Sequence, residues 1–225
     1  DTVTVATQLS NASVDLGAGA DKLMLGNFAN TATVANIETL VGGSDADVIT
    51  VSAALDGSNS IDLGAGADKL TLGNFANSGS VGNVETLLGG SSTDEITIVS
   101  QLSGASINLG ADVDSLTLGD FVNSATISNV ESILGGSDAD TLTLATQASA
   151  MSVDLGSGTD ALIMGDFANT ITLSNVESVQ GGSAADTVTF ATQLSNATIN
   201  LGSGADVVTL ADLANTVTIS SVETI

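Results

Sequence analysis

Residues 16–21 read Leu-Gly-Ala-Gly-Ala-Asp, and the Leu-Gly pair that opens this stretch returns four more times along the chain. The pairs begin at Leu16, Leu63, Leu109, Leu155 and Leu201, so the spacings are 47, 46, 46 and 46 residues. A fixed period of this length is typical of units that cannot bury their own apolar surface and must stack on their neighbours. The period predicts one solenoid array with five repeats, at residues 1–46, 47–93, 94–139, 140–185 and 186–225.

Each repeat contains, twice, an aspartate followed by a short run in which every second residue is apolar, as Val3 and Val5 are after Asp1. Thr-Val-Thr-Val follows Asp1, and Lys-Leu-Met-Leu follows Asp21. Residues at every second position share one face of a β-strand, so these runs predict strands with one buried face. We call the turn that ends at each aspartate the near turn and the turn that follows its strand the far turn. We expect a second strand beyond each far turn, for example over residues 13–16 and 33–40. The pattern predicts an all-β parallel solenoid of about ten coils, one per aspartate, with two facing parallel sheets.

Composition restricts the chemistry that this chain can perform. Its 225 residues include 26 acidic residues and only two lysines, for a net charge of -24, and they include no His, Cys, Trp, Tyr or Pro. Without His or Cys there is no imidazole base, thiol nucleophile or soft-metal site, so we expect no enzyme. Nucleic acids and anionic membranes require Lys and Arg clusters, which are absent, and no apolar run approaches the ~18 residues of a membrane helix.

The near turns hold the candidate binding residues, because nine six-residue turns keep Gly second and Asp sixth. Glycine permits a tight turn with positive φ that aims carbonyl oxygens inward, and the aspartate adds an anionic oxygen. Stacked carboxylates one strand apart repel each other by on the order of 1 kcal/mol per pair in water, and a cation between turns would remove this repulsion. Ca²⁺ fits such oxygen ligands better than Mg²⁺ does. The predicted ligands are Asp21, Asp47, Asp68, Asp94, Asp114, Asp140, Asp160, Asp186 and Asp206, with Asp45, Asp112 and Asp138 as additional ligands.

These turns resemble the repeats-in-toxin (RTX, haemolysin-type) calcium-binding β-roll, whose nonapeptide is Gly-Gly-x-Gly-x-Asp-x-apolar-x. Residues 42–50, GGSDADVIT, and 135–143, GGSDADTLT, come nearest to it, and the preceding Asn-Ile-Glu-Thr-Leu at 36–40 looks like the phrase that leads into such turns in large secreted bacterial proteins. Every second turn departs from the nonapeptide by starting with Leu, and the others lack its fourth-position Gly. The turn that contains Ala184 is the weakest candidate.

The resemblance implies a Ca²⁺-stabilised structural segment of a secreted bacterial surface protein, such as an adhesin stalk, a surface-layer component or a matrix filament. In that family, low intracellular calcium keeps the chain unfolded for export, and extracellular calcium folds and stiffens it. The uncapped strands at both ends of the array lead us to expect either end-to-end self-association or continuation of a longer repeat protein.

Two other functions remain open from the sequence. A threonine three residues after the coil aspartate, as at Thr4, Thr50 and Thr71, predicts an outward row that suits an ice- or carbohydrate-binding face, although strand propensity alone also favours Thr. Outward carboxylates and amides at equivalent positions form a possible polysaccharide-cleaving set: Asp15, Asp62, Asn108, Asp154 and Asn200. Their even repetition argues against catalysis, which normally requires an asymmetric group of residues.

The far turns carry two further series of residues. Leucines and phenylalanines alternate there and are predicted to plug the ends of the thin core: Leu9, Leu55, Leu102, Leu194, Phe28, Phe75, Phe121 and Phe167. One large apolar residue per turn would close such a core. Between them lies an asparagine series, which we interpret as turn formers or a hydrogen-bonded ladder: Asn30, Asn77, Asn123, Asn169 and Asn215.

Overall fold

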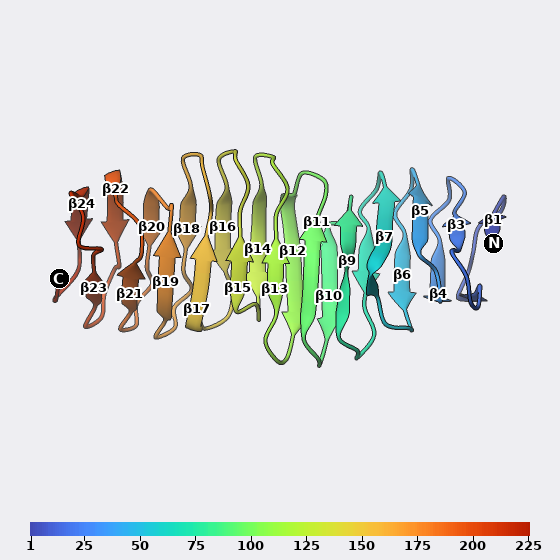
Figure 1. Ribbon diagram of the computed structural model, residues 1–225, viewed down its shortest axis with the longest axis horizontal. Coiled ribbons are helices and arrows are strands. Elements are labelled where there is room, and N and C mark those ends of the chain that lie inside the picture. The colour runs from blue at the N-terminus through green and yellow to red at the C-terminus, as the bar shows by residue number, and fades with distance from the viewer.

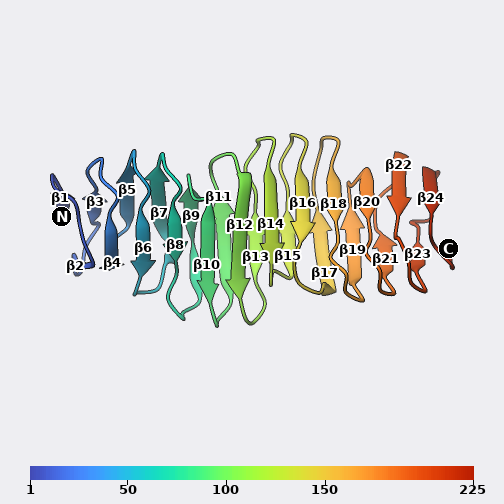
Figure 2. The same cartoon turned by 180° about the vertical axis from the view of Figure 1, so that it is seen from behind.

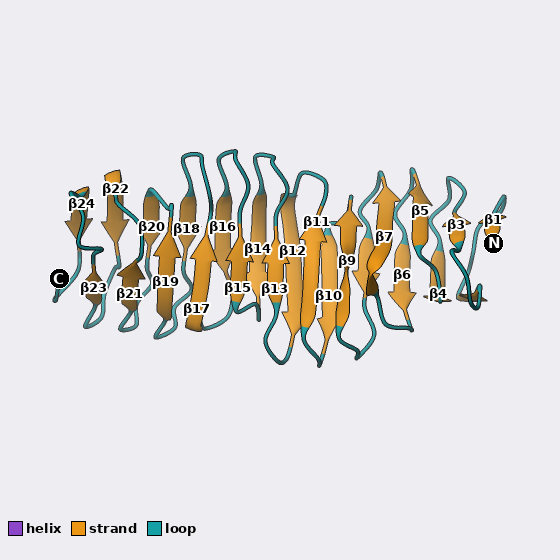
Figure 3. Ribbon diagram, viewed as in Figure 1, coloured by secondary structure: helices purple, strands orange, loops and turns teal.

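A computed structural model describes residues 1–225 as an elongated array of 24 strands without a helix, with the two termini at opposite ends (Figures 1 and 3). The chain alternates between two parallel sheets of 12 strands, one holding the odd-numbered and the other the even-numbered strands. The view from behind in Figure 2 shows the same regular stacking. The predicted all-β parallel solenoid with two facing sheets is therefore confirmed.

The strands are short, and most have three to six residues. Their bounds are β1 Thr2–Thr4, β2 Ala12–Asp15, β3 Lys22–Met24, β4 Thr31–Ala35, β5 Thr39–Gly43, β6 Val48–Val51, β7 Asp56–Gly64, β8 Lys69–Thr71, β9 Asn77–Gly82, β10 Thr86–Gly90, β11 Asp94–Ile98, β12 Ser103–Gly110, β13 Ser115–Thr117, β14 Ser124–Ser128, β15 Ser132–Leu134, β16 Thr141–Leu144, β17 Ser149–Asp154, β18 Ala161–Ile163, β19 Thr170–Ser174, β20 Ser178–Gln180, β21 Thr187–Phe190, β22 Ser195–Asn200, β23 Val207–Thr209 and β24 Thr216–Ser220.

The number of strands per repeat differs from the prediction. Residues 1–46 supply five strands, β1 to β5, because the stretch 33–40 contains the end of β4 and the start of β5 rather than one strand. Between them Asn36 turns the chain with φ 54°, a left-handed conformation that Asn tolerates better than most residues. Each of the first four repeats therefore makes two and a half coils, and the predicted count of about ten coils is close but low.

This half coil places successive repeats in opposite orientations. The first repeat begins in the odd-numbered sheet with β1, and the second begins in the even-numbered sheet with β6. We name edge I the edge where odd-numbered strands turn into even-numbered ones, and edge II the opposite edge. Equivalent turns of consecutive repeats therefore alternate between edge I and edge II. The predicted arrangement, with one turn aspartate in every coil, would have placed all of these turns on the same edge.

The core lies between the two sheets and runs the whole length of the array. It contains 47 buried apolar residues, nearly all of them Leu, Ile, Val and Ala at alternate strand positions. The parallel register aligns them in columns, so that Ile96 of β11 lies beside Leu116 of β13, which lies beside Ile133 of β15. Each fully buried side chain of this size contributes roughly 1.5–3 kcal/mol to folding, and the continuous columns join every coil to the next.

The apolar residues of the far turns have two different environments. Leu55, Leu102 and Leu194 are buried, as predicted. The prediction that phenylalanines also plug the core is wrong, because all four are 39–44% exposed: Phe28, Phe75, Phe121 and Phe167. Each ring packs on the outside of a tight turn against the glycine two residues earlier, where an added Cβ would lie 2.8–3.0 Å from the ring.

Glycines allow the near turns of neighbouring coils to stack backbone on backbone. Gly156, the second residue of a Leu-Gly turn, has φ +84°, and a Cβ there would lie 2.1 Å from the carbonyl oxygen of Gly136 in the preceding coil. A Cβ on Gly135 would in turn lie 2.4 Å from the carbonyl oxygen of Leu155. The Gly-Gly turn and the following Leu-Gly turn therefore form a stacked pair that no larger residue permits.

Candidate functional site

The nine turn aspartates stand at or immediately before the first residue of a strand and are buried, with exposed fractions of 0–2%. Their carboxylates point along the solenoid axis and accept backbone N–H groups of the preceding coil. Asn30 donates to Asp47 Oδ1 from its backbone N, at 2.8 Å, and from its side chain, at 2.9 Å. The backbone N of Asp47 donates to Asp68 Oδ1 at 2.6 Å, and that of Asp68 donates to Glu85 Oε2 at 2.6 Å. We call this arrangement the Asn-Asp-Asp-Glu ladder.

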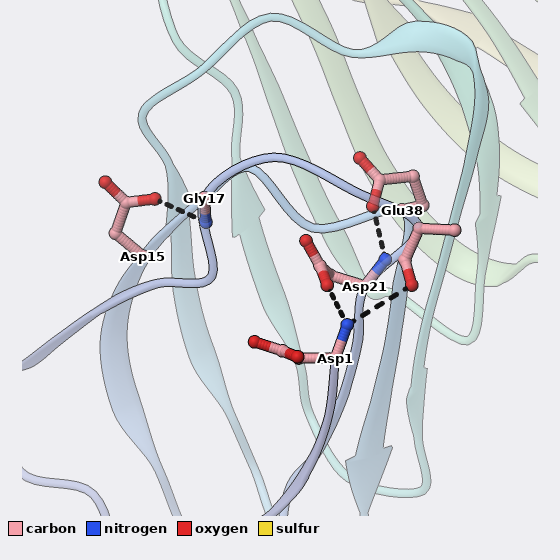
Figure 4. Close-up of polar contacts among 6 residues, drawn as sticks. Asp1, Asp15, Gly17, Asp21 and Glu38 are labelled. Atoms are coloured by element: carbon pink, nitrogen blue, oxygen red, sulfur yellow. Dashed lines mark hydrogen bonds and ion pairs between the residues drawn. The ribbon is translucent and has the colours of Figure 1, made fainter.

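The complete ladder occurs four times and alternates between the two edges. It joins Asn30, Asp47, Asp68 and Glu85 on edge I, Asn77, Asp94, Asp114 and Glu131 on edge II, Asn123, Asp140, Asp160 and Glu177 on edge I, and Asn169, Asp186, Asp206 and Glu223 on edge II. A shorter version at the start of the chain contains Asp21, whose amide donates to Glu38 Oε2 at 2.6 Å and whose carboxylate contacts the amino group of Asp1 (Figure 4). The asparagines were predicted to be turn formers or a hydrogen-bonded ladder, and Asn30 shows that they are both. Its side chain donates to Asp47 Oδ1 in the next coil and to the carbonyl oxygens of Gly26 and Phe28 in its own turn.

The second carboxylate oxygen of most ladder aspartates has no partner. Buried Oδ2 atoms without a hydrogen bond occur at Asp21, Asp68, Asp114, Asp140, Asp160, Asp186 and Asp206. Leaving a buried polar group unsatisfied costs about 1–3 kcal/mol, and more for a charged group. These oxygens are therefore the points of the ladder at which a proton or a cation would relieve a penalty.

Burial also changes the acidity of these carboxyls. It raises the pKa of Asp68, Asp114 and Asp160 from 3.8 to about 6, against the opposing effect of the backbone hydrogen bonds that they accept. Neighbouring carboxylates add to the increase, among them Glu131 beside Asp114. The ladder thus carries groups that resist ionisation in the absence of a neutralising partner.

The donor set fits a hard cation only in part. The atoms available are oxygens, which Ca²⁺ prefers, and one free Oδ2 lies in each Leu-Gly turn. However, no point in the structure gathers three or more acidic side chains, because each ladder aspartate lies a coil away from the next. A cation in a turn would therefore be held by one or two carboxylates together with backbone carbonyl oxygens.

The three additional predicted ligands lie on exposed parts of the turns. Asp45, Asp112 and Asp138 are solvent-accessible, in contrast to the buried ladder. Asp112 raises the pKa of Asp114, and Asp138 raises that of Asp140, so these two lie near enough to act electrostatically on the ladder. Asp112 has φ 79°, whereas the glycines at the same position of the other Leu-Gly turns have φ of 143–153°, so its turn has a different shape.

The outward carboxylates predicted as a possible catalytic set have a structural role. Asp15 Oδ1 accepts the backbone N–H of Gly17 at 3.0 Å (Figure 4). It also accepts the side-chain amide of Asn36 at 2.7 Å. Asp62 and Asp154 make the same pair of contacts in later repeats. Each therefore closes a turn and links it to the next coil.

The sequence reasoning missed the glutamates that end each ladder. Each stands 17 residues after an aspartate and two residues after a left-handed residue, as Glu85 follows Asp68 and Asn83. That left-handed residue is an asparagine in every case except Glu223, where it is Ser221. The Asn-x-Glu spacing was visible in the sequence, but its structural meaning depends on the extra half coil.

The threonines that were predicted to form one outward row are distributed over both sheets. Thr4 belongs to β1 and Thr50 to β6, which are in opposite sheets. Within the odd-numbered sheet, Thr4 aligns with Met24, whereas Thr97 aligns with Ser80 and Thr117. The row is thus divided into short pairs in different columns.

Comparisons of the chain with protein-family models, with curated proteins and with solved structures found no match. The structure also contains no helix long and apolar enough to cross a membrane.

Proposed function

We propose that this chain is a structural, Ca²⁺-binding repeat segment of an extracellular bacterial surface protein, such as an adhesin stalk, a surface-layer component or a matrix filament. The observation that supports this proposal is the series of buried, unpartnered Oδ2 atoms that recurs along both edges. Their even repetition suits a role distributed over the whole array, whereas catalysis needs one asymmetric group of residues.

Five aspartates of the Leu-Gly turns are the residues that would hold the cations: Asp21, Asp68, Asp114, Asp160 and Asp206. In each, Oδ1 remains hydrogen-bonded in the ladder, and Oδ2 is free for a cation. A bound Ca²⁺ supplies positive charge next to carboxylates that burial otherwise destabilises. With a net charge of -24, the unliganded chain repels itself, which opposes compact folding and favours an extended chain at low calcium.

A second candidate function is a binding face for ice or carbohydrate on the outside of a sheet. One outward column in the odd-numbered sheet consists of hydroxyl residues over six consecutive strands: Ser115, Ser132, Ser152, Thr172, Thr189 and Thr209. An ice-recrystallisation assay and a glycan array test this alternative directly. Activity that disappears when Ser152 and Thr172 are replaced by Lys would favour it.

The calcium proposal is tested by far-ultraviolet circular dichroism during addition of Ca²⁺ to chelator-treated protein, with Mg²⁺ as the control cation. We expect a cooperative increase in β structure with Ca²⁺ that Mg²⁺ does not reproduce. The ladder variant D68N/D114N/D160N is compared with D120N/D166N/D212N, which removes the same charge from exposed turns. The first variant should lose most of the response and the second should keep it.

Two results would contradict the proposal that the turns bind Ca²⁺. One is a protein that is already fully β in chelator and gains no stability from Ca²⁺. The other is an equal loss of response in both triple variants, which would show that net charge matters and the ladder does not.

A further inference from the structure

A cavity of about 160 Å³ opens on edge II where the first repeat meets the second, between the turn at residues 36–38 and the segment 53–59. Its inner wall is apolar and includes the buried side chains of Val34, Ile37 and Leu55. Its outer wall includes the more accessible Glu38 and Asp56. The cavity thus combines an apolar interior with two carboxylates toward solvent.

The cavity coincides with a place where the second repeat lacks side chains that the other repeats have. In later repeats a hydroxyl accepts the backbone N–H of the left-handed asparagine in the preceding coil, as Thr146 accepts that of Asn129 at 2.8 Å. The equivalent residue here is Ala53, so the backbone N–H of Asn36 has no such partner. The next residue in later repeats is a glutamine whose side chain donates to a backbone carbonyl, and here it is Ala54.

The equivalent positions elsewhere show that these truncations matter. On edge II two repeats later, where Thr146 and Gln147 are present, the cavity measures only about 50 Å³. No cavity is found at the two equivalent positions on edge I, which carry Ser100 with Gln101 and Thr192 with Gln193. The second repeat is also one residue longer than the others, and its extra residue falls in the bulged stretch between Asp56 and Asn59.

The two carboxylates at the cavity have no cationic partner in the protein. The only ion pair of the structure joins the N-terminal amino group to Asp21, and neither lysine lies within 4.0 Å of an acidic group. Glu38 uses Oε2 to accept the amide of Asp21, and Asp56 accepts hydrogen bonds from Ser58. Both retain accessible oxygen for a ligand, and an anionic ligand would be repelled.

We propose that this cavity binds a small organic cation, an alkyl or cycloalkyl ammonium whose apolar body fills the space beside Val34, Ile37 and Leu55 and whose ammonium group faces Glu38 and Asp56. An apolar cavity of about 150 Å³ holds a molecule of the size of benzene, so a six-carbon body matches the volume. This binding site goes beyond the proposed structural function and does not depend on calcium in the turns.

The test is a titration of the folded, ¹⁵N-labelled chain with cyclohexylammonium, followed by amide shifts in two-dimensional NMR. Cyclohexanol is the neutral probe of the same shape. The decisive variant is A53T/A54Q, which restores the residues of the other repeats without changing the net charge. It therefore separates binding in the cavity from loose attraction of cations to an acidic surface.

We expect saturable shifts centred on Asn36, Ala53 and Leu55, at least tenfold weaker binding in A53T/A54Q, and weaker binding of cyclohexanol to the native chain. D56N should reduce cyclohexylammonium affinity severalfold. The thermal midpoint of A53T/A54Q should equal or exceed that of the native protein, which shows that it still folds. Unchanged binding in A53T/A54Q, equal affinity for cyclohexanol, or the absence of saturable shifts would each overturn the proposal.

Discussion

The backbone N–H of Asp47 donates a hydrogen bond of 2.6 Å to Oδ1 of Asp68, which lies one coil further along the solenoid. Hydrogen bonds to ionised acceptors are roughly twice as strong as neutral ones, so this contact is a firm link between coils. The two oxygens of this carboxylate therefore have different roles: Oδ1 binds the neighbouring coil, and Oδ2 remains available to a proton or a cation. The same aspartate can therefore stabilise the fold directly and still respond to protons or cations.

Acidification in the absence of calcium should stabilise the protein. Burial raises the pKa of Asp68, Asp114 and Asp160 to about 6, whereas 3.8 is the ordinary value expected in the unfolded chain. Between these pH values the folded state binds more protons than the unfolded state, so stability increases as pH falls through 6 toward 4. Urea unfolding in chelator should therefore give a higher midpoint at pH 5 than at pH 7.5.

The controls for this pH dependence use the same variants as the calcium test. D68N/D114N/D160N should flatten the profile between pH 5 and 7.5, and D120N/D166N/D212N should leave it unchanged. Saturating Ca²⁺ should flatten it as well, because a cation and a proton compete for the same oxygens. A midpoint that rises from pH 5 to pH 7.5 in chelator would contradict the assignment of raised pKa values.

Asn77 should be far more important for stability than Asn74, three residues earlier in the same turn. The side chain of Asn77 donates to Asp94 Oδ1 at 2.8 Å and to the carbonyl oxygen of Phe75 at 2.8 Å, and it accepts the amide of Leu55 at 3.2 Å. N77A leaves these buried groups unpaired and should cost about 3 kcal/mol of unfolding free energy. The exposed Asn74 makes no side-chain hydrogen bond, so N74A should change stability by less than about 0.5 kcal/mol. Similar denaturant midpoints for the two variants would show that the ladder contributes little.

Replacing Gly156 and Gly17 by alanine should separate backbone strain from steric overlap. Both glycines have φ +84°, so alanine at either position should cost about 1 kcal/mol of conformational strain. A Cβ on Gly17 meets nothing within 4 Å, but a Cβ on Gly156 would lie 2.1 Å from the carbonyl oxygen of Gly136. We expect G156A to lose about 2–3 kcal/mol more than G17A in denaturant unfolding, since overpacking has costs of this size. Equal losses would show that the stacked turns separate easily.

The sequence predicted the parts of the fold that depend on local pattern. Alternation around Val3 and Leu23 was enough to identify strands, and the repeat period was enough to identify a solenoid with two facing sheets. The alignment on the aspartates, however, missed one strand in each of the first four repeats. In the first repeat this strand is β5, which begins after Glu38 and has no aspartate before it. Counting strands correctly required knowing that Asn36 reverses the chain, which is a backbone property.

The candidate site was predicted in its residues but not in its geometry. The turn aspartates were recognised from their fixed place after Gly, yet their hydrogen bonds depend on which coils are neighbours, and that depends on the half coil. Phe28 and Leu55 occupy comparable turn positions and are both apolar, but one lies outside the turn and the other inside. Such differences are decided by the path of the backbone, and the hydrophobic pattern does not encode them.

The final prediction concerns Ala150, which has φ +56° at the start of β17. The equivalent positions of the other repeats hold residues suited to the left-handed region: Asn11, Gly57, Gly104 and Asn196. An alanine there has about 1–2 kcal/mol of conformational strain, which glycine would remove. Glycine also increases the entropy of the unfolded chain, which offsets part of this gain, so A150G should stabilise the protein by about 0.5–1 kcal/mol. A145G, at an exposed position without positive φ, should instead destabilise it by about 0.4–1 kcal/mol. Thermal and urea unfolding of the two variants give the comparison, and a loss of stability in both would show that the turn at Ala150 is not strained.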